Sequence, residues 1–162
     1  YNYGVANAEL AELAKTIADK NNIPLLVDSR FRLENFAGAT SATPNQEEVE
    51  EILGKELDEN SCAALCKKLG YKSLLVTLGN KGMILFEDGK EPLHLDSVGS
   101  KEPIDVTGAG DTVIAAYALG LASGLGFADA AKIANYAGGI VVMKKGTASV
   151  TIDELLNAVN KG

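Results

Sequence analysis

The sequence predicts an α/β fold, with a mostly parallel sheet covered by helices on both faces, as in a three-layer α/β/α sandwich. Short, continuously apolar runs such as 24–28 and 73–77 are typical of buried parallel strands. These runs alternate with segments whose apolar residues recur at helical spacing, the first of which is 7–21. Because no internal repeat or low-complexity linker interrupts this order, we expect the 162 residues to belong to one domain.

The first half of the sequence begins with a predicted amphipathic helix. Leu10, Leu13 and Ile17 lie three and four residues apart, so they share one face of that helix. The expected helices and strands of this half cover 7–21, 24–28, 39–43, 46–54, 60–69 and 73–77, with an irregular loop over 29–38.

The second half begins with a predicted β-hairpin, because Asp88-Gly89 separates two apolar runs. The expected strands are 83–86 and 92–95, and the expected helices are 110–124, 128–143 and 152–160. Thr151 and Glu154 predict a capping box at the start of the last helix. Gly138 and Gly139 lie inside an expected helix, where each glycine costs about 1 kcal/mol of stability relative to alanine. Close packing or a ligand near the backbone would explain it.

Composition excludes several classes of function. A net charge of −7 argues against binding nucleic-acid phosphates. No apolar run is long enough to span a bilayer, and the pattern of a signal peptide is absent, so we expect no membrane association. Cys62 and Cys66 share a helical stripe with Leu65 and Leu69, which favours core packing over a metal site or a disulfide. His94 lies in a predicted strand as a half-buried polar side chain. These features are typical of a cytoplasmic protein.

The strongest chemical signal is the segment 105–111, Asp-Val-Thr-Gly-Ala-Gly-Asp. Gly108 and Gly110 let the backbone turn sharply before a helix, and the free N–H groups of that helix start would form an anion site. Asp111 beside such a site is suited to be a general base for an alcohol that attacks a phosphoryl group. The alternative is a tight loop in which Asp111 only complements the helix dipole.

The longer string 105–116, Asp-Val-Thr-Gly-Ala-Gly-Asp-Thr-Val-Ile-Ala-Ala, resembles the C-terminal signature of the PfkB, or ribokinase-like, carbohydrate kinases. The resemblance implies a ribokinase-like fold and an ATP-dependent kinase that acts on a small sugar or sugar phosphate. It also implies that Asp111 is the catalytic base and that the backbone of Gly108, Ala109 and Gly110 forms the anion hole.

A magnesium site is implied by Pro44-Asn45-x-x-Glu48, which is similar to the family's motif for hydrated Mg²⁺ and phosphate. The same residues predict a helix-capping box, in which Asn45 caps and Glu48 reaches back. The two interpretations are compatible.

The resemblance also implies a K⁺ or other monovalent-cation site, formed by Asp105, Thr107 and carbonyl groups of 141–149. The spacing after Gly146 differs by about one residue from that of ribokinase, which argues against Ser149 as a ligand. The alternative is that Asp105 and Thr107 form ordinary loop hydrogen bonds.

Nucleotide contacts are implied at Thr77-Leu-Gly79-x-x-Gly82, since the family places a similar turn against the nucleotide. Alone, this string is a turn into the next strand. Asn135 and Gly138 match a helix that the family places beside adenine, although their spacing also suits packing.

A weaker substrate contact is Arg30, which follows the strand end at Asp28, where ligands of α/β proteins bind. A cation there could reach a phosphate, or it could simply be solvated.

The resemblance covers the second half of a family member, so we expect 1–162 to be the C-terminal portion of a single kinase domain. Residues 1–5 resemble a D-Y-G-x-G segment that lies near the middle of family members, with Asn in place of Asp and Val in place of the second Gly. The preceding part normally supplies most sugar contacts. We therefore expect this protein to be inactive alone and to self-associate through exposed strand edges.

Within the family, several details resemble the kinase domain of ADP-heptose synthases, which phosphorylates heptose 7-phosphate at O1. These details are Pro92-Leu-His94, 105–114, 146–147 and the ending 154–159. Ribokinase-like or fructokinase-like substrates remain alternatives, as does a non-catalytic nucleotide-binding role.

Overall fold

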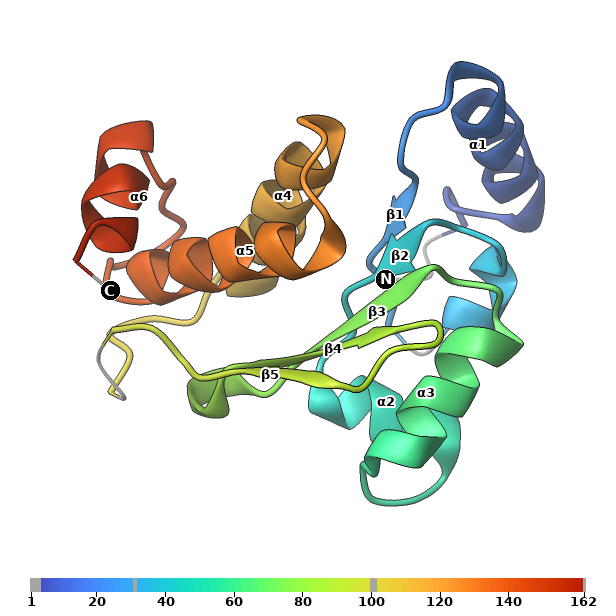
Figure 1. Cartoon of the computed structure of the whole chain (residues 1–162), viewed down its shortest axis with the longest axis horizontal. Coiled ribbons are helices and arrows are strands. Elements are labelled where there is room, and N and C mark those ends of the chain that lie inside the picture. The colour runs from blue at the N-terminus through green and yellow to red at the C-terminus, as the bar shows by residue number, and fades with distance from the viewer. Residues whose placement is uncertain (1–3, 31, 100–101, 162) are drawn as a thin grey trace. The chain divides into compact units, whose positions relative to one another are not determined.

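The computed structural model describes residues 4–30, 32–99 and 102–161, and it has the predicted α/β composition (Figure 1). The helices are α1 (Ala8–Asn21), α2 (Gln46–Leu53), α3 (Glu59–Lys68), α4 (Ala109–Ala122), α5 (Phe127–Val141) and α6 (Ile152–Val159). The strands are β1 (Leu26–Val27), β2 (Ser41–Ala42), β3 (Ser73–Thr77), β4 (Met83–Glu87) and β5 (Leu93–Leu95). Short 3-10 turns, η1 (Leu33–Phe36) and η2 (Gly79–Lys81), lie in the connections.

The strands form one sheet in the order β1-β2-β3-β4-β5. The first three strands are parallel, with Leu26 opposite Ser41 and Ser41 opposite Ser73. The turn between β4 and β5 contains Gly89 at φ +73°, as the predicted hairpin requires. The predicted fold class is therefore confirmed.

The protein consists of two compact units. Unit 1 comprises the residues up to Thr77 together with Leu85–Leu93. Its core includes the buried β3 residues 73–76 and the predicted stripe of α3. Cys62 and Cys66 are buried, unpaired with each other, and have thiol pKa values raised to about 11 by burial, so the prediction of core cysteines is confirmed.

Unit 2 comprises Leu78–Ile84 and the residues from His94 onward, and its helices α4 and α5 pack closely. A Cβ atom at Gly138 would lie 3.0 Å from Val113 Cγ2 on α4. A Cβ atom at Gly139 would lie 2.3 Å from the Val98 carbonyl oxygen. Close packing therefore accounts for both glycines without a ligand.

Some local expectations were wrong. The predicted strand 39–43 is paired only at Ser41–Ala42, and the loop 29–38 contains η1. The apolar face of α1 is half exposed at Leu10 and Leu13. His94 is exposed on β5 rather than half-buried.

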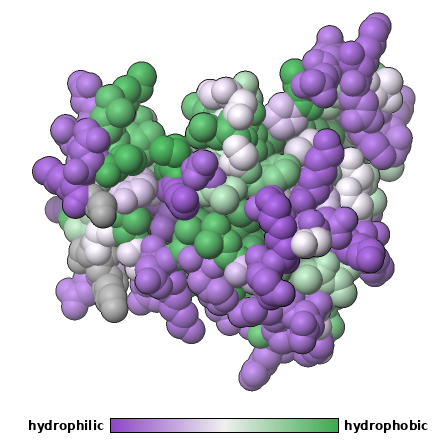
Figure 2. All heavy atoms as spheres, in the orientation of Figure 1, coloured by the Kyte–Doolittle hydropathy of each residue, from purple (hydrophilic) through white to green (hydrophobic). Residues whose placement is uncertain are grey.

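Exposed apolar side chains also occur on α6, including Ile152 and Leu156, and hydrophobic residues are visible there in Figure 2. Within 4–30, 32–99 and 102–161, no helix combines the length and the hydropathy needed to cross a bilayer.

Candidate functional site

The loop before α4 turns sharply at Gly108, which caps the helix at φ +76°. This left-handed conformation favours glycine. The helix begins at Ala109, one residue earlier than predicted. The Gly108 carbonyl accepts hydrogen bonds from the N–H of Thr112 (3.0 Å) and from its hydroxyl (2.9 Å). The first turn of α4 is thus held firmly to the loop.

The amide groups of this first turn differ in their partners. The Ala109 N–H donates to the Val106 carbonyl at 3.1 Å and closes the turn. The described residues provide no acceptor for the amides of Gly110 and Asp111, and both residues are exposed. Because the positive end of the helix dipole lies at these amides, the first turn can bind an anion.

The side chain of Asp111 is exposed on the same turn. Its carboxylate forms no hydrogen bond or ion pair with any residue in the described ranges. A carboxylate that is neither buried nor paired can accept a proton from a bound alcohol.

Asp105, at the N-terminal end of this loop, stabilises it through two hydrogen bonds. Its Oδ1 accepts the Thr107 N–H and its Oδ2 accepts the Gly146 N–H, each at 2.9 Å. These amides, with the Thr107 side chain, lower the pKa of the Asp105 carboxyl. Unit 2 therefore brings Asp105, Thr107 and the segment 142–146 together. The Ser149 carbonyl accepts a hydrogen bond from Lys144 Nζ at 2.7 Å.

The turn 77–82 contains two glycines with different surroundings. Gly82 has φ +94°, and a Cβ atom there would lie 1.9 Å from the Leu95 carbonyl oxygen. The absence of a side chain at Gly82 is thus required by the neighbouring strand β5. Gly79 has φ +60° and faces open space, so it alone is free to admit a ligand near the backbone.

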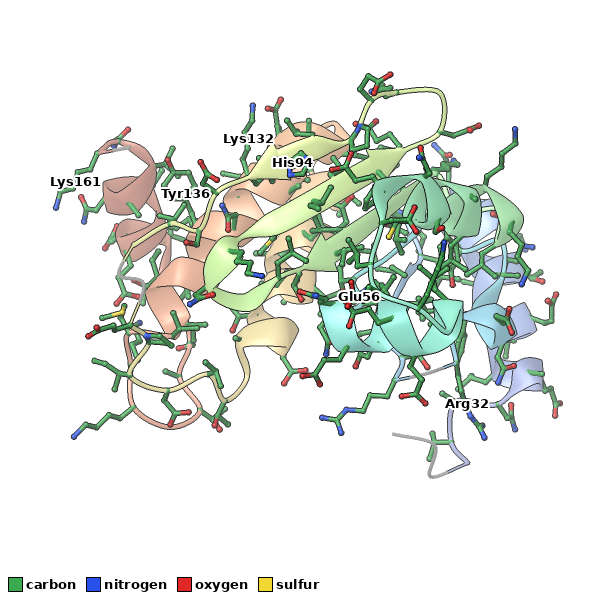
Figure 3. All side chains as sticks on the ribbon, turned by 90° about the horizontal axis from the view of Figure 1, so that it is seen from below. Arg32, Glu56, His94, Lys132, Tyr136 and Lys161 are labelled. Atoms are coloured by element: carbon green, nitrogen blue, oxygen red, sulfur yellow. The ribbon has the colours of Figure 1, made fainter. Side chains whose placement is uncertain are left out.

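Asn135 is buried on α5, one residue before Tyr136 (Figure 3), and its Nδ2 donates to the Asp96 carbonyl at 2.7 Å. The next residue, Ser97, donates from its hydroxyl to the Asn80 carbonyl at 2.8 Å. The segment 96–97 therefore connects the turn at Gly79 to α5. Sequence reasoning missed this link, because a backbone carbonyl acceptor leaves no signal in residue type.

Unit 1 carries the predicted metal motif. Asn45 Oδ1 accepts the Glu48 N–H at 2.9 Å, and Glu48 Oε2 accepts the Asn45 N–H at 3.0 Å. The predicted capping box is therefore confirmed. Asn45 also pairs with Thr77, whose N–H donates to Pro44, so this corner lies at the carboxyl end of β3.

Glu48 is only 6% exposed, and burial raises the pKa of its carboxyl. The Asn45 amide opposes this rise, the Asp28 carboxylate adds to it, and the Arg30 guanidinium lowers the pKa. Arg30 is thus near enough to interact electrostatically with the acidic corner.

The residues of this corner fit a hydrated Mg²⁺. Glu48 Oε1 has no hydrogen-bond partner in the described part of the chain, and a nearby cation would favour the ionised form of this carboxyl. The described residues include no cluster of three or more His, Cys, Asp or Glu that could hold a metal ion directly. Binding through water, which Mg²⁺ retains readily, suits Asn45 and Glu48.

Residues 3–154 match the family model described as pfkB family carbohydrate kinase. The chain belongs to this family. The resemblance seen in the segment 105–116 is therefore confirmed. Residues 1–3 of the segment that resembles D-Y-G-x-G lie outside the described ranges.

The chain is 46% identical over 167 residues to the bifunctional protein HldE of Psychromonas ingrahamii. It is 41% identical over 163 residues to the HldE protein of Haemophilus influenzae. Each match covers 98% of this chain and 34% of the relative. The chain thus spans about a third of the length of the curated relatives it matches.

Among solved structures, the chain is similar to the ribokinase of Arabidopsis thaliana complexed with ribose and ATP, with a TM-score of 0.83 and 24% identity. This match covers 94% of the chain and 52% of the ribokinase. Phosphofructokinase-2 of Escherichia coli in complex with potassium gives a TM-score of 0.82 at 21% identity, over 98% of the chain and 53% of that protein. These similarities confirm the ribokinase-like fold of the chain.

Proposed function

We propose that this protein transfers the γ-phosphoryl group of ATP to a hydroxyl of a sugar or sugar phosphate. One observation carries the proposal: the carboxylate of Asp111 and the amides at 110 and 111 lie on one helix turn, and none of them has a partner among the described residues. In a chain of the pfkB family, this pairing of base and anion site suits phosphoryl transfer.

In this mechanism, Asp111 accepts the proton of the sugar hydroxyl while the oxygen attacks the γ-phosphorus. The bond from phosphorus to the bridging oxygen breaks, and ADP leaves with that electron pair. The amides of Gly110 and Asp111 donate hydrogen bonds to the phosphoryl oxygens as charge redistributes. A positioned general base contributes about 10²–10⁴-fold, and orientation contributes much of the rest.

Asn45 and Glu48 would hold Mg²⁺ through water, and the ion, when bound, neutralises charge on the phosphate oxygens. Asp105 and Thr107 would hold a monovalent cation with backbone carbonyls of 141–149. The complex of phosphofructokinase-2 with potassium supports the cation assignment. Gly79 would lie against the nucleotide, with Thr77, Gly82, Asn135 and Gly138 supporting that surface.

Heptose 7-phosphate, phosphorylated at O1, is the acceptor we propose first. The resemblance of 92–94, 105–114, 146–147 and 154–159 to the kinase domain of ADP-heptose synthases supports this acceptor. The 41–46% identity to bifunctional HldE proteins extends over nearly the whole chain. Ribose and fructose 6-phosphate are the alternatives.

The test has two parts, because the chain spans only part of its relatives. Calorimetry first measures MgATP binding by this chain. Transfer from γ-labelled ATP to heptose 7-phosphate, ribose and fructose 6-phosphate is then followed in the protein that contains the complete kinase domain. We expect binding in the first part and transfer chiefly to heptose 7-phosphate in the second. Binding without transfer to any sugar would favour the non-catalytic nucleotide-binding role and contradict the kinase.

A further inference from the structure

The hydroxyl of Thr43 is buried without a partner. Thr43 follows β2 directly and is 7% exposed. In the described part of the chain, its Oγ1 is the only side-chain nitrogen or oxygen that is itself shielded from solvent, with an accessible area under 1 Å², and that lacks a hydrogen bond. Since leaving a buried hydroxyl unpaired is unfavourable, its presence here needs an explanation.

The other buried hydroxyls on the same strands are satisfied. Side chains alternate along a strand, so Ser41 and Thr43 point to the same face of the sheet. The Ser41 hydroxyl donates to the Ser73 carbonyl at 2.9 Å, and the Ser73 hydroxyl donates to Ser41 Oγ at 2.8 Å. The sheet therefore pairs its hydroxyls in the interior and leaves one unpaired only at the carboxyl end of β2.

The backbone on both sides of Thr43 is fixed. The Thr43 N–H donates to the Val27 carbonyl at 3.1 Å. Pro44 is fully buried, and its carbonyl accepts the Thr77 N–H at 3.0 Å. Thr43 is therefore held at the edge where ligands of parallel sheets bind.

The neighbours of Thr43 at this edge are charged. Leu26 pairs with Ser41 and Val27 with Ala42, so the same register places Asp28 beside Thr43. Asn45 and Glu48 follow two and five residues later, and Glu48 interacts electrostatically with Asp28. The two carboxylates outnumber the one guanidinium, that of Arg30, which interacts with this corner. A bare anion is therefore disfavoured there, whereas phosphate accompanied by a divalent cation is not.

We propose that the Thr43 hydroxyl is a positioning contact for the magnesium-bound triphosphate of ATP. It hydrogen-bonds an oxygen of that group, which is either a phosphate oxygen or a water on the ion. A neutral hydroxyl suits both, since it donates to phosphate and accepts from water. This inference rests on the proposed function and adds a residue outside the Asn45–Glu48 motif.

The test compares Thr43→Val, which removes the hydroxyl at nearly constant shape, with Thr43→Ser, which keeps it. Calorimetry of the full chain with MgATP should show Kd raised about tenfold by Thr43→Val and changed less than about twofold by Thr43→Ser. The melting temperature without ligand should not fall in Thr43→Val, because no internal hydrogen bond is lost. Thr43→Ala serves as a second variant if valine disturbs the fold.

Repeating the titration with ATP in EDTA distinguishes the two oxygen sources. A persistent loss of affinity in Thr43→Val indicates a phosphate oxygen, and a loss seen only with magnesium indicates a metal-bound water. Adenosine, which has no phosphate, should bind both variants as it binds the original protein. Equal MgATP affinity in Thr43→Val and the original protein overturns this inference alone. Failure of the original protein to bind MgATP overturns it together with the proposed function.

Discussion

Two aspartates at the ends of one loop differ in what their carboxylates contact. Both carboxylate oxygens of Asp105 accept backbone amides, whereas the Asp111 carboxylate has no partner in the described residues. Asp105 therefore fixes the loop, and Asp111 is available for chemistry. Their residue type is the same, and the two amides that bond Asp105, those of Thr107 and Gly146, distinguish them.

The Asp105 anchor should depend on pH in a defined direction. Its pKa is lowered from the ordinary value of 3.8, so its contribution to the loop is complete above that value and is lost as the pH falls through the lower folded pKa. The Gly146 amide chemical shift, followed by NMR, should stay constant from neutral pH down to about pH 4 and change below it. A midpoint above pH 4 would contradict the two hydrogen bonds.

At the scale of single elements, α2 combines a helix cap with the proposed magnesium contact. Asn45→Asp keeps a good N-cap, whereas Asn45→Ala removes it and should lower the free energy of unfolding by about 1 kcal/mol. Both changes replace the side-chain amide that we propose orients water on the ion. The Mg²⁺ concentration needed for half-maximal ATP binding should therefore rise about tenfold or more. Urea unfolding and magnesium titrations measure the two effects separately. An unchanged Mg²⁺ requirement in both variants would leave Asn45 as a cap only.

The turn at 77–82 offers a matched pair of glycines. Gly82→Ala adds a Cβ atom that meets the Leu95 carbonyl at φ +94°, so it should destabilise the protein by about 3 kcal/mol or more. Gly79→Ala has a positive φ but open space, so about 1 kcal/mol is expected. Thermal unfolding of both variants measures the difference. Equal losses would show that β5 does not approach Gly82 this closely.

Elements encoded by neighbouring residues were predictable. Capping boxes at Asn45–Glu48 and Thr151–Glu154 join groups three residues apart, and both formed as predicted. The Asp105–Gly146 bond joins residues 41 apart, so no local pattern indicates it. The exposure of the apolar face of α1 was equally hidden, because helical spacing predicts a face but not what covers it.

The candidate site residues also differ in this way: features set by the local sequence were predictable, and features set by tertiary contacts were not. The sequence identified Gly82 as a nucleotide contact, yet the nearby strand explains that glycine through tertiary packing. It did not identify Thr43, because an unpaired hydroxyl becomes evident only when its surroundings are known. Gly108 was predictable, since a sharp turn into a helix requires its positive φ.

At the scale of the whole molecule, the proposed contacts to MgATP are divided between the two units. Asn45 and Glu48 belong to unit 1, whereas Gly79 and the amides at 110 and 111 belong to unit 2. Binding of MgATP should slow hydrogen exchange at each of these two sets of residues. At 100 times Kd, it should also stabilise the protein by about 2.7 kcal/mol.

Hydrogen exchange with and without MgATP measures this division, and magnesium with adenosine serves as the control. We expect protection at 45–48 and at 108–112. Unchanged exchange at 45–48 would contradict the proposed magnesium contact, and unchanged exchange at 108–112 would contradict the proposed anion site.

The most direct measurement is the steady-state kinetics of Asp111→Asn in the protein that contains the complete kinase domain. This change keeps the backbone N–H of residue 111 and the shape of the side chain, but it removes the carboxylate that acts as the base. We expect kcat to fall about 10²–10⁴-fold while the Kd for MgATP changes less than about threefold. Turnover close to that of the original enzyme would contradict the assignment of Asp111 as the base.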